Sequence, residues 1–162
     1  MRRREPGPRP SGPPQSSTLR GTPSPGRTGL RFAGYAAVFD RPDRGGDVVR
    51  AGAFARSLKC GATAVPLLWQ HEPGRPIGRI EYLREDRRGL RVIGRLSGGA
   101  AGREAAALLK EGALSGLSFG YRVREASGEA PRELVELDLV EVSLVTLPMQ
   151  PKARVHALET LG

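Results

Sequence analysis

The chain has 162 residues, a formal net charge of +9, 38% apolar residues and 5% aromatic residues, which suits one domain with an aliphatic core. The sequence contains no run of about 18 apolar residues, so it predicts no transmembrane helix. Its basic start also lacks the apolar stretch of a secretory signal. The lone Cys60 excludes an internal disulfide, and His71 and His156 are the only histidines beside it. We therefore predict no metal, no cofactor and a cytoplasmic protein.

The first 27 residues differ in composition from the rest of the chain. They hold six arginines against one glutamate, and seven of the chain's fourteen prolines. Such a segment cannot bury enough apolar surface to offset the entropy of ordering it. We therefore predict a disordered basic arm over 1–27 and a folded domain over 28–162. The simpler interpretation of the arm is a solvated tail or an unused upstream start. The other interpretation is a contact with nucleic acid or an acidic partner.

From Thr28 onward, apolar residues at every second position predict a mainly β domain with short helices. Turn-rich and glycine-rich segments separate the elements, and Gly112 marks the end of the longer helix. Pro66 is expected either to place its strand at a sheet edge or to occupy the first position of that strand. The predicted strands cover residues 30–38, 48–49, 65–70, 77–83, 90–96, 117–123 and 134–147, and the predicted helices cover 52–59 and 101–111. This pattern favours a small barrel or a packed sheet.

His71 directly follows the apolar segment 65–70. A histidine at the end of a strand can be held rigidly with its ring toward a cleft, and a neutral imidazole is a good general base near pH 7. A hydrogen-bonded histidine at the rim of the fold explains the same position.

Ser118 is the candidate nucleophile. In the predicted strand around it, apolar residues share one face, and Gly116, Ser118 and Gly120 share the other. A hydroxyl between two residues without side chains lies on open backbone, which a peptide could approach. A polar strand serine between two turn or bulge glycines is the alternative. Ser115 lies nearer the helix end, where serines commonly bond to local backbone.

The pattern Gly116-x-Ser118-x-Gly120 also matches the nucleophile elbow of α/β-hydrolases. That elbow places a strand before the serine and a helix after it, whereas here a strand is predicted to follow. An esterase using Ser118, Asp138 and His156 is therefore the less favoured alternative. An extended strand after Gly120 would exclude it.

Four acidic residues lie in or beside the last predicted strand: Glu133, Glu136, Asp138 and Glu141. Glu141 has apolar neighbours on both sides, and burying a carboxylate without a partner is costly. A histidine N–H is one candidate partner, which would fix the ring's tautomer, and an arginine is the other. Strict strand alternation predicts that Asp138 and Glu141 point to opposite faces, so at most one faces Ser118.

Short stretches spread over residues 28–156 together resemble the prohead maturation proteases of tailed phages and gene transfer agents. The stretches are Gly34–Asp40, Gly46–Val49, Gly52–Phe54, Leu67–Glu72, Pro76–Arg79, Gly89–Val92, Gly112–Tyr121 and Val140–Pro148. The resemblance implies a serine endopeptidase with the architecture of herpesvirus assemblin: mainly β with short helices (α+β), a small closed β-barrel surrounded by helices. It maps the catalytic histidine onto His71 and the serine onto Ser118, and places Glu141 where assemblins carry a second histidine.

The resemblance also implies the substrates, which are extensions of the scaffold or the major capsid protein. They would be cut inside the immature procapsid in the bacterial cytoplasm, with self-processing and a homodimer as further expectations and no membrane. In the expected mechanism His71 takes the proton of Ser118, and Glu141 orients His71. The alternative from another class is a non-catalytic assembly factor that binds scaffold and contacts nucleic acid through the basic arm. Salt-sensitive binding lost on deleting 1–27, without proteolysis, would distinguish it.

Overall fold

The computed structural model describes residues 29–161, so the predicted basic arm over 1–27 lies outside the described residues. The elements of this part are β1 (Gly29–Val38), β2 (Val48–Val49), α1 (Ala55–Leu58), the 3-10 helix η1 (Ala62–Ala64), β3 (Leu67–Trp69), β4 (Glu72–Glu85), β5 (Gly89–Leu96), α2 (Ala100–Lys110), β6 (Gly116–Ser127), β7 (Glu133–Val145) and β8 (Val155–Leu161). Within residues 29–161, no helix is long and apolar enough to span a bilayer. The mainly β domain with few helices is confirmed.

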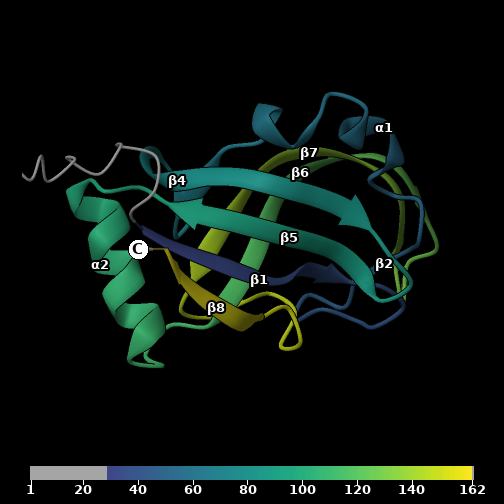
Figure 1. The fold of residues 1–162 in the computed structure, drawn as a ribbon. Coiled ribbons are helices and arrows are strands. Elements are labelled where there is room, and N and C mark those ends of the chain that lie inside the picture. Colours follow the sequence, from purple (N-terminus) through teal and green to yellow (C-terminus); the bar gives the residue numbers. More distant parts are fainter. Residues whose placement is uncertain (1–28, 162) are drawn as a thin grey trace, which may run out of the picture.

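One curved sheet holds all eight strands of the described part. Its order is β2-β7-β3-β4-β5-β1-β8, and β6 pairs with β7. In Figure 1, β4, β5 and β1 form the front layer and β6 and β7 cross behind them, with α2 and α1 at opposite ends. Register shifts interrupt several of the ladders, and such bulges bend strands and increase their twist. The sheet can therefore fold over on itself and enclose a core.

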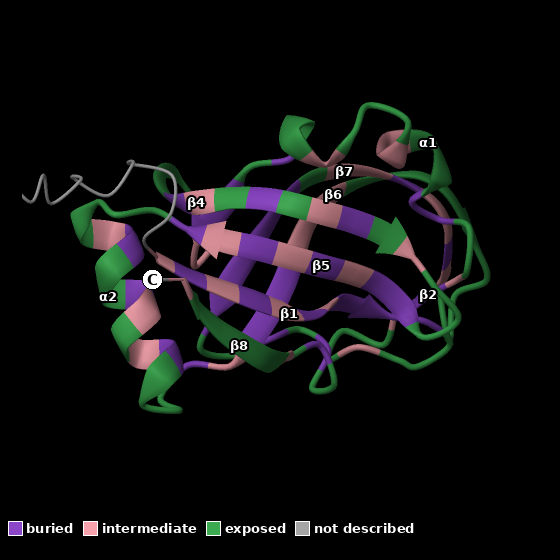
Figure 2. Cartoon of the chain, viewed as in Figure 1, coloured by how far each residue is buried: buried purple, intermediate pink, exposed green. Residues whose placement is uncertain are grey.

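The core lies between the two layers and is mostly aliphatic, as the composition predicts. Along β1 and β5, buried residues alternate with less buried ones, and Figure 2 shows this alternation as purple bands on β5. Only Phe32 and Phe54 are aromatic among the largest fully buried side chains of residues 29–161. Helix α2 covers one end of the sheet and buries Gly102, Ala105 and Leu109. Gly112, with a φ of 74°, follows this helix where a C-terminal stop was predicted.

Of the two placements expected for the strand that contains Pro66, the structure rules out the sheet edge, because β3 lies between β4 and β7. Pro66 precedes its first residue, so the missing N–H interrupts no ladder, and the Pro66 carbonyl accepts a hydrogen bond from the Val142 N–H at 3.1 Å. The sequence pattern also missed β8. Within the described part of the chain this strand pairs with β1 alone, and it is exposed along most of its length, so it carries little apolar alternation.

The strand ladder does not close into the barrel expected from the sequence. Among the strands of residues 29–161, β8 forms a ladder only with β1, and β6 only with β7. Where β6 and β8 approach each other, one isolated β-bridge pairs Gly116 with Arg154. Two hydrogen bonds flank it, from Leu117 N to Ala153 O (2.9 Å) and from Val155 N to Ser115 O (2.8 Å). The chain shortly before Arg154 is a turn, and β8 then pairs with β1, so the pairing with β6 ends after one bridge.

Candidate active site

The β6–β7 ladder places the candidate residues opposite one another. Ser118 pairs with Ser143, and Gly120 pairs with Glu141. Leu117 belongs to the buried core, so its neighbour Ser118 points to the other, outer face of the sheet. The alternation expected around Ser118 is thus present, and the ladder brings Glu141 to the same outer face.

His71 reaches this face from a tight turn after β3. Gln70 and His71 have φ values of 49° and 62°, a left-handed conformation that non-glycine residues rarely adopt. Two hydrogen bonds hold the turn against β7: Gln70 N donates to Leu144 O at 2.9 Å, and His71 N donates to Ser143 Oγ at 3.1 Å. Nothing in the sequence indicated this backbone conformation.

The His71 ring hydrogen-bonds through Nδ1 to Oε1 of Glu141. The carboxylate is buried, with 6% of the residue exposed, whereas the His71 side chain is 41% exposed. The hydrogen bond to Glu141 raises the pKa of His71, and partial burial of the ring opposes that rise. Of the two candidate partners of Glu141, a histidine and an arginine, the structure therefore shows the histidine.

Ser143 completes this cluster, and the sequence reasoning missed it. Its fully buried hydroxyl donates a hydrogen bond to Oε2 of Glu141 at 2.6 Å and accepts one from the His71 N–H. Alternation in the segment Glu141-Val142-Ser143 was the available signal, because it places the first and third residues on one face.

The two glycines beside Ser118 do not leave open backbone, which corrects the interpretation made from the sequence. A Cβ on Gly120 would lie 3.0 Å from Cδ and 3.1 Å from Cγ of Glu141. A Cβ on Gly116 would lie 2.5 Å from the carbonyl oxygen of Val145 and 2.9 Å from Cδ of Pro148. The absent side chains thus make room for Glu141 at one glycine and for the Val145 carbonyl and Pro148 at the other.

Ser118 is 4% exposed. Within residues 29–161 its hydroxyl has no hydrogen-bond partner, so the structure brings His71 and Glu141 into contact and leaves Ser118 on the same face without a bond to the ring. Serine–histidine hydrogen bonds are often long before substrate binds, so this geometry is compatible with a nucleophile and its base.

Asp138 shares the outer face with Glu141, contrary to the strict alternation predicted. The register steps from Gly120–Glu141 to Tyr121–Leu139, so Val140 is an extra residue in β7. Asp138 is nevertheless not part of the His71 cluster. Both of its carboxylate oxygens accept hydrogen bonds at 2.7 Å from Nε of Arg124.

The esterase arrangement of Ser118, Asp138 and His156 is not formed. His156 lies beside Tyr35, with 5.9 Å between ring centroids, and its Nε2 is 3.2 Å from Nη1 of Arg91. The chain after Gly120 continues as strand β6 to Ser127. Because the nucleophile elbow requires a helix there, this reading is excluded.

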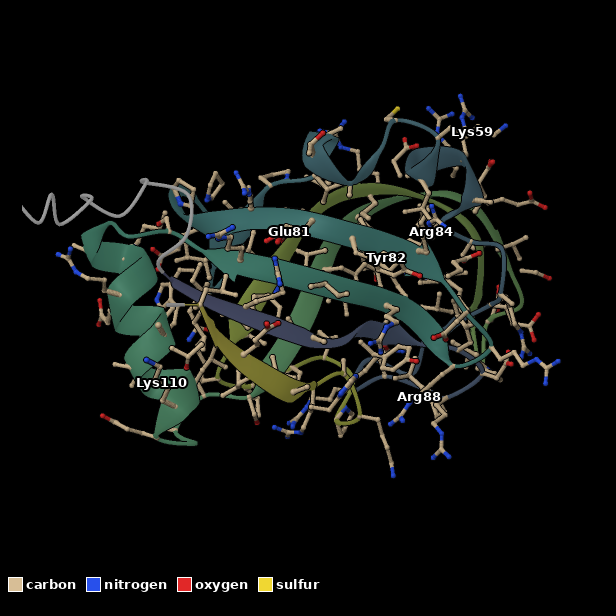
Figure 3. All side chains as sticks on the ribbon, in the orientation of Figure 1. Lys59, Glu81, Tyr82, Arg84, Arg88 and Lys110 are labelled. Atoms are coloured by element: carbon tan, nitrogen blue, oxygen red, sulfur yellow. The ribbon has the colours of Figure 1, made fainter. Side chains whose placement is uncertain are left out.

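The opposite side of the molecule carries exposed charges without such a cluster. Figure 3 labels Glu81 and Arg84 on the outer side of the front layer. Arg31 pairs with Glu81 at 3.2 Å, and Arg84 lies 5.6 Å from the centre of the Tyr82 ring. Among residues 29–161, no group of three or more histidine, cysteine or acidic side chains is arranged to hold a metal ion.

Comparison with known proteins gives one family and several relatives. The family model for the caudovirus prohead serine protease matches residues 20–161. The prohead protease of Enterobacteria phage HK97 is 30% identical over 144 residues, which cover 84% of this chain and 63% of that protein. The capsid polyprotein of Pseudomonas phage PAJU2 is 28% identical over 130 residues, 74% of this chain and 19% of that protein. The chain thus spans less than two thirds of either relative.

Two solved structures share the fold. The bacteriophage T4 capsid assembly protease, gp21, superposes with a TM-score of 0.57 at 15% identity, covering 72% of this chain and 82% of that one. The KSHV protease in complex with a hexapeptide phosphonate inhibitor gives a TM-score of 0.55 at 16% identity, covering 81% and 65%. At these identities the likeness concerns the fold alone.

Proposed function

The chain belongs to the family of caudovirus prohead serine proteases, and on this premise we propose that it is a serine endopeptidase of capsid maturation. The proposal assigns Ser118 as the nucleophile, His71 as the general base and Glu141 as the acid that orients His71. One observation carries this assignment: the Nδ1 atom of His71 is bonded to a buried carboxylate on the same sheet face as Ser118.

The hydrogen bond to Glu141 selects the useful tautomer of His71. With the ring proton held on Nδ1, Nε2 is free to accept the proton of Ser118 Oγ. The oxygen then attacks the scissile carbonyl carbon, and the tetrahedral intermediate collapses as His71 returns the proton to the leaving amine. Water attacks the acyl-enzyme ester with His71 again as base, and Ser118 is regenerated.

The buried carboxylate also stabilises the imidazolium that forms during both steps. A negative charge hydrogen-bonded to the ring favours its protonated form, which agrees with the raised pKa of His71. Removing the orienting acid of a catalytic triad can reduce turnover by about four orders of magnitude. Glu141 is expected to act through His71, without touching the substrate.

The proposed substrates are the major capsid protein, the scaffold protein or extensions of either. Similarity to a phage prohead protease and to part of a phage capsid polyprotein supports this choice. Cleavage inside the procapsid, in the cytoplasm of the bacterial host, belongs to the same proposal. So do self-processing and a homodimer.

The test compares two serines of the same segment. The full chain is produced together with its cognate capsid and scaffold proteins, and mass spectrometry reports shortened products. Ser118→Ala is expected to abolish cleavage. Ser115→Ala is expected to leave most of it, because the Ser115 hydroxyl already accepts a hydrogen bond from Nη1 of Arg154 at 2.7 Å.

The opposite pattern would reassign the nucleophile to Ser115. Binding of capsid proteins without cleavage by the parent chain would contradict the protease assignment. It would support the non-catalytic assembly factor instead, most directly if high salt or deletion of residues 1–27 abolished the binding.

A further inference from the structure

Ser143 connects the two residues on which the proposed mechanism depends. It is fully buried on β7, opposite Ser118 in the ladder. Its hydroxyl donates to Glu141 Oε2 at 2.6 Å and accepts from the backbone N–H of His71 at 3.1 Å. One side chain therefore bonds to both the acid and the residue that carries the base.

The bond to Oε2 fixes the rotation of the Glu141 carboxylate. The terminal torsion of a glutamate is broad, so a single hydrogen bond through Oε1 would leave the carboxylate plane free to turn. With Oε2 held by Ser143, Oε1 faces Nδ1 of His71. The donated proton also satisfies part of the hydrogen-bonding capacity of a buried charge, which is costly to leave unmet.

The bond from the His71 N–H fixes the start of the His71 side chain. Gln70 and His71 both have a left-handed backbone, which costs free energy and persists only where the surroundings hold it. Ser143 supplies the acceptor for the second of these residues. Without that acceptor the turn loses one restraint, and a shift of about 1 Å in a catalytic group can reduce the rate by about a hundredfold.

We propose that Ser143 is a positioning residue that holds Glu141 and His71 in the geometry required for proton transfer. This inference rests on the function proposed above. Ser143 acts through the base and the acid rather than on substrate, so its loss is expected to lower kcat and to leave KM unchanged. It is also expected to weaken the influence of Glu141 on the ring.

The chain itself offers a control for the structural part of this role. The hydroxyl of Ser57 accepts a hydrogen bond from Leu139 N at 2.9 Å and donates one to Leu137 O at 3.2 Å. Ser57 thus links α1 to the backbone of β7 through its hydroxyl, at a place that is away from His71. Ser57→Ala removes a comparable pair of bonds without touching the cluster.

The experiment measures turnover and the titration of His71. Turnover is measured on full chains carrying Ser143→Ala, Ser143→Cys or Ser57→Ala with the cognate capsid protein as substrate. Proton NMR follows the imidazole signals in a Ser118→Ala background, which prevents self-cleavage. The chain has two histidines, and His156 beside Arg91 serves as an internal reference.

We expect Ser143→Ala to lower kcat by about ten- to a hundredfold and to shift the pKa of His71 downward, with KM unchanged. The shift is downward because Glu141 raises the pKa of His71, and a carboxylate that is held less firmly against the ring raises it less. Ser143→Cys keeps the branching of the side chain with a slightly larger atom and a weaker donor, so an intermediate result is expected even where Ser143→Ala does not fold.

The inference is overturned if Ser143→Ala and Ser143→Cys match Ser57→Ala in both kcat and the His71 titration. Failure of the proposed function would look different. In that case the parent chain would cleave no substrate, and the NMR titration would still decide whether Ser143 positions the His71–Glu141 pair.

Discussion

The two halves of the β6–β7 ladder use similar polar residues in different surroundings. In the half that pairs 116–120 with 141–145, Ser118, Glu141 and Ser143 are all buried. In the half that pairs 122–127 with 133–138, residues of β6 are exposed and Asp138 meets Arg124 at the surface. A carboxylate in the first half is expected to tune the chemistry of a histidine, whereas one in the second half is expected to act as a solvated surface charge.

An extra residue separates the two halves. Val140 is bulged out of the register and 44% exposed, and every residue of β7 after it is buried. Because of this bulge, Asp138 and Glu141 share one face although they are three positions apart. The two carboxylates therefore differ in their burial and in their position along the ladder, and not in the face of the sheet on which they lie.

The largest expected effect follows from neutralising the buried carboxylate. Glu141→Gln keeps the shape of the side chain and removes the charge that, in the proposed mechanism, orients His71 and stabilises its cation. We expect kcat to fall by up to about four orders of magnitude with a native circular dichroism spectrum. Cleavage of the cognate capsid protein, followed by mass spectrometry, measures the loss.

Asp138→Asn is the matched change in the exposed half. It is expected to leave turnover at the parental level, because Arg124 is the partner it loses. If Asp138→Asn were folded and inactive while Glu141→Gln cleaved like the parent, the acid would be misassigned.

A second prediction tests the space that Glu141 occupies. A Cβ on Gly120 would meet the end of the Glu141 side chain, which can move, whereas the backbone around it is not strained. Gly120→Ala is therefore expected to displace the carboxylate without unfolding the chain, and to lower kcat by about a hundredfold.

Gly98→Ala serves as the control for this change, because a Cβ there would meet nothing within 4 Å and its φ is not positive. It is expected to have parental kcat and melting temperature. Parental turnover of Gly120→Ala would show that the position of the carboxylate is not limiting.

The sequence predicted most of the fold and the contact between His71 and Glu141, but not how the site is held. Alternation identified the strands with one buried face, and it missed β8 because that edge strand is mostly exposed. It could not place Val140, since a bulge depends on the register with a neighbouring strand. The left-handed turn at His71 and the bonds of Ser143 likewise depend on contacts between distant segments.

The pH dependence of cleavage offers a third prediction. In the proposed mechanism His71 must be neutral to accept the proton of Ser118, so activity is expected to be lost as pH falls through the pKa of His71. Because Glu141 raises this pKa above its ordinary value of 6.5, the midpoint of the acid limb is expected above 6.5. In Glu141→Gln the residual activity is expected to have its midpoint at lower pH. Profiles of kcat against pH for the two chains check this, and coincident acid limbs would contradict it.

The smallest effect is expected from the ion pair of the exposed half. Arg124 and Asp138 lie 2.7 Å apart, but their side chains are 43% and 36% exposed, so water and salt screen the attraction. The gain from pairing is also offset by the entropy of holding a long arginine side chain in place. Arg124→Ala, Asp138→Ala and the double variant are therefore expected to change the melting temperature additively at physiological salt. Their turnover should match the parent, because neither side chain contacts His71, Glu141 or Ser143. A strong non-additive loss of stability, or loss of turnover in either single variant, would show that the two halves of the ladder are coupled across the Val140 bulge.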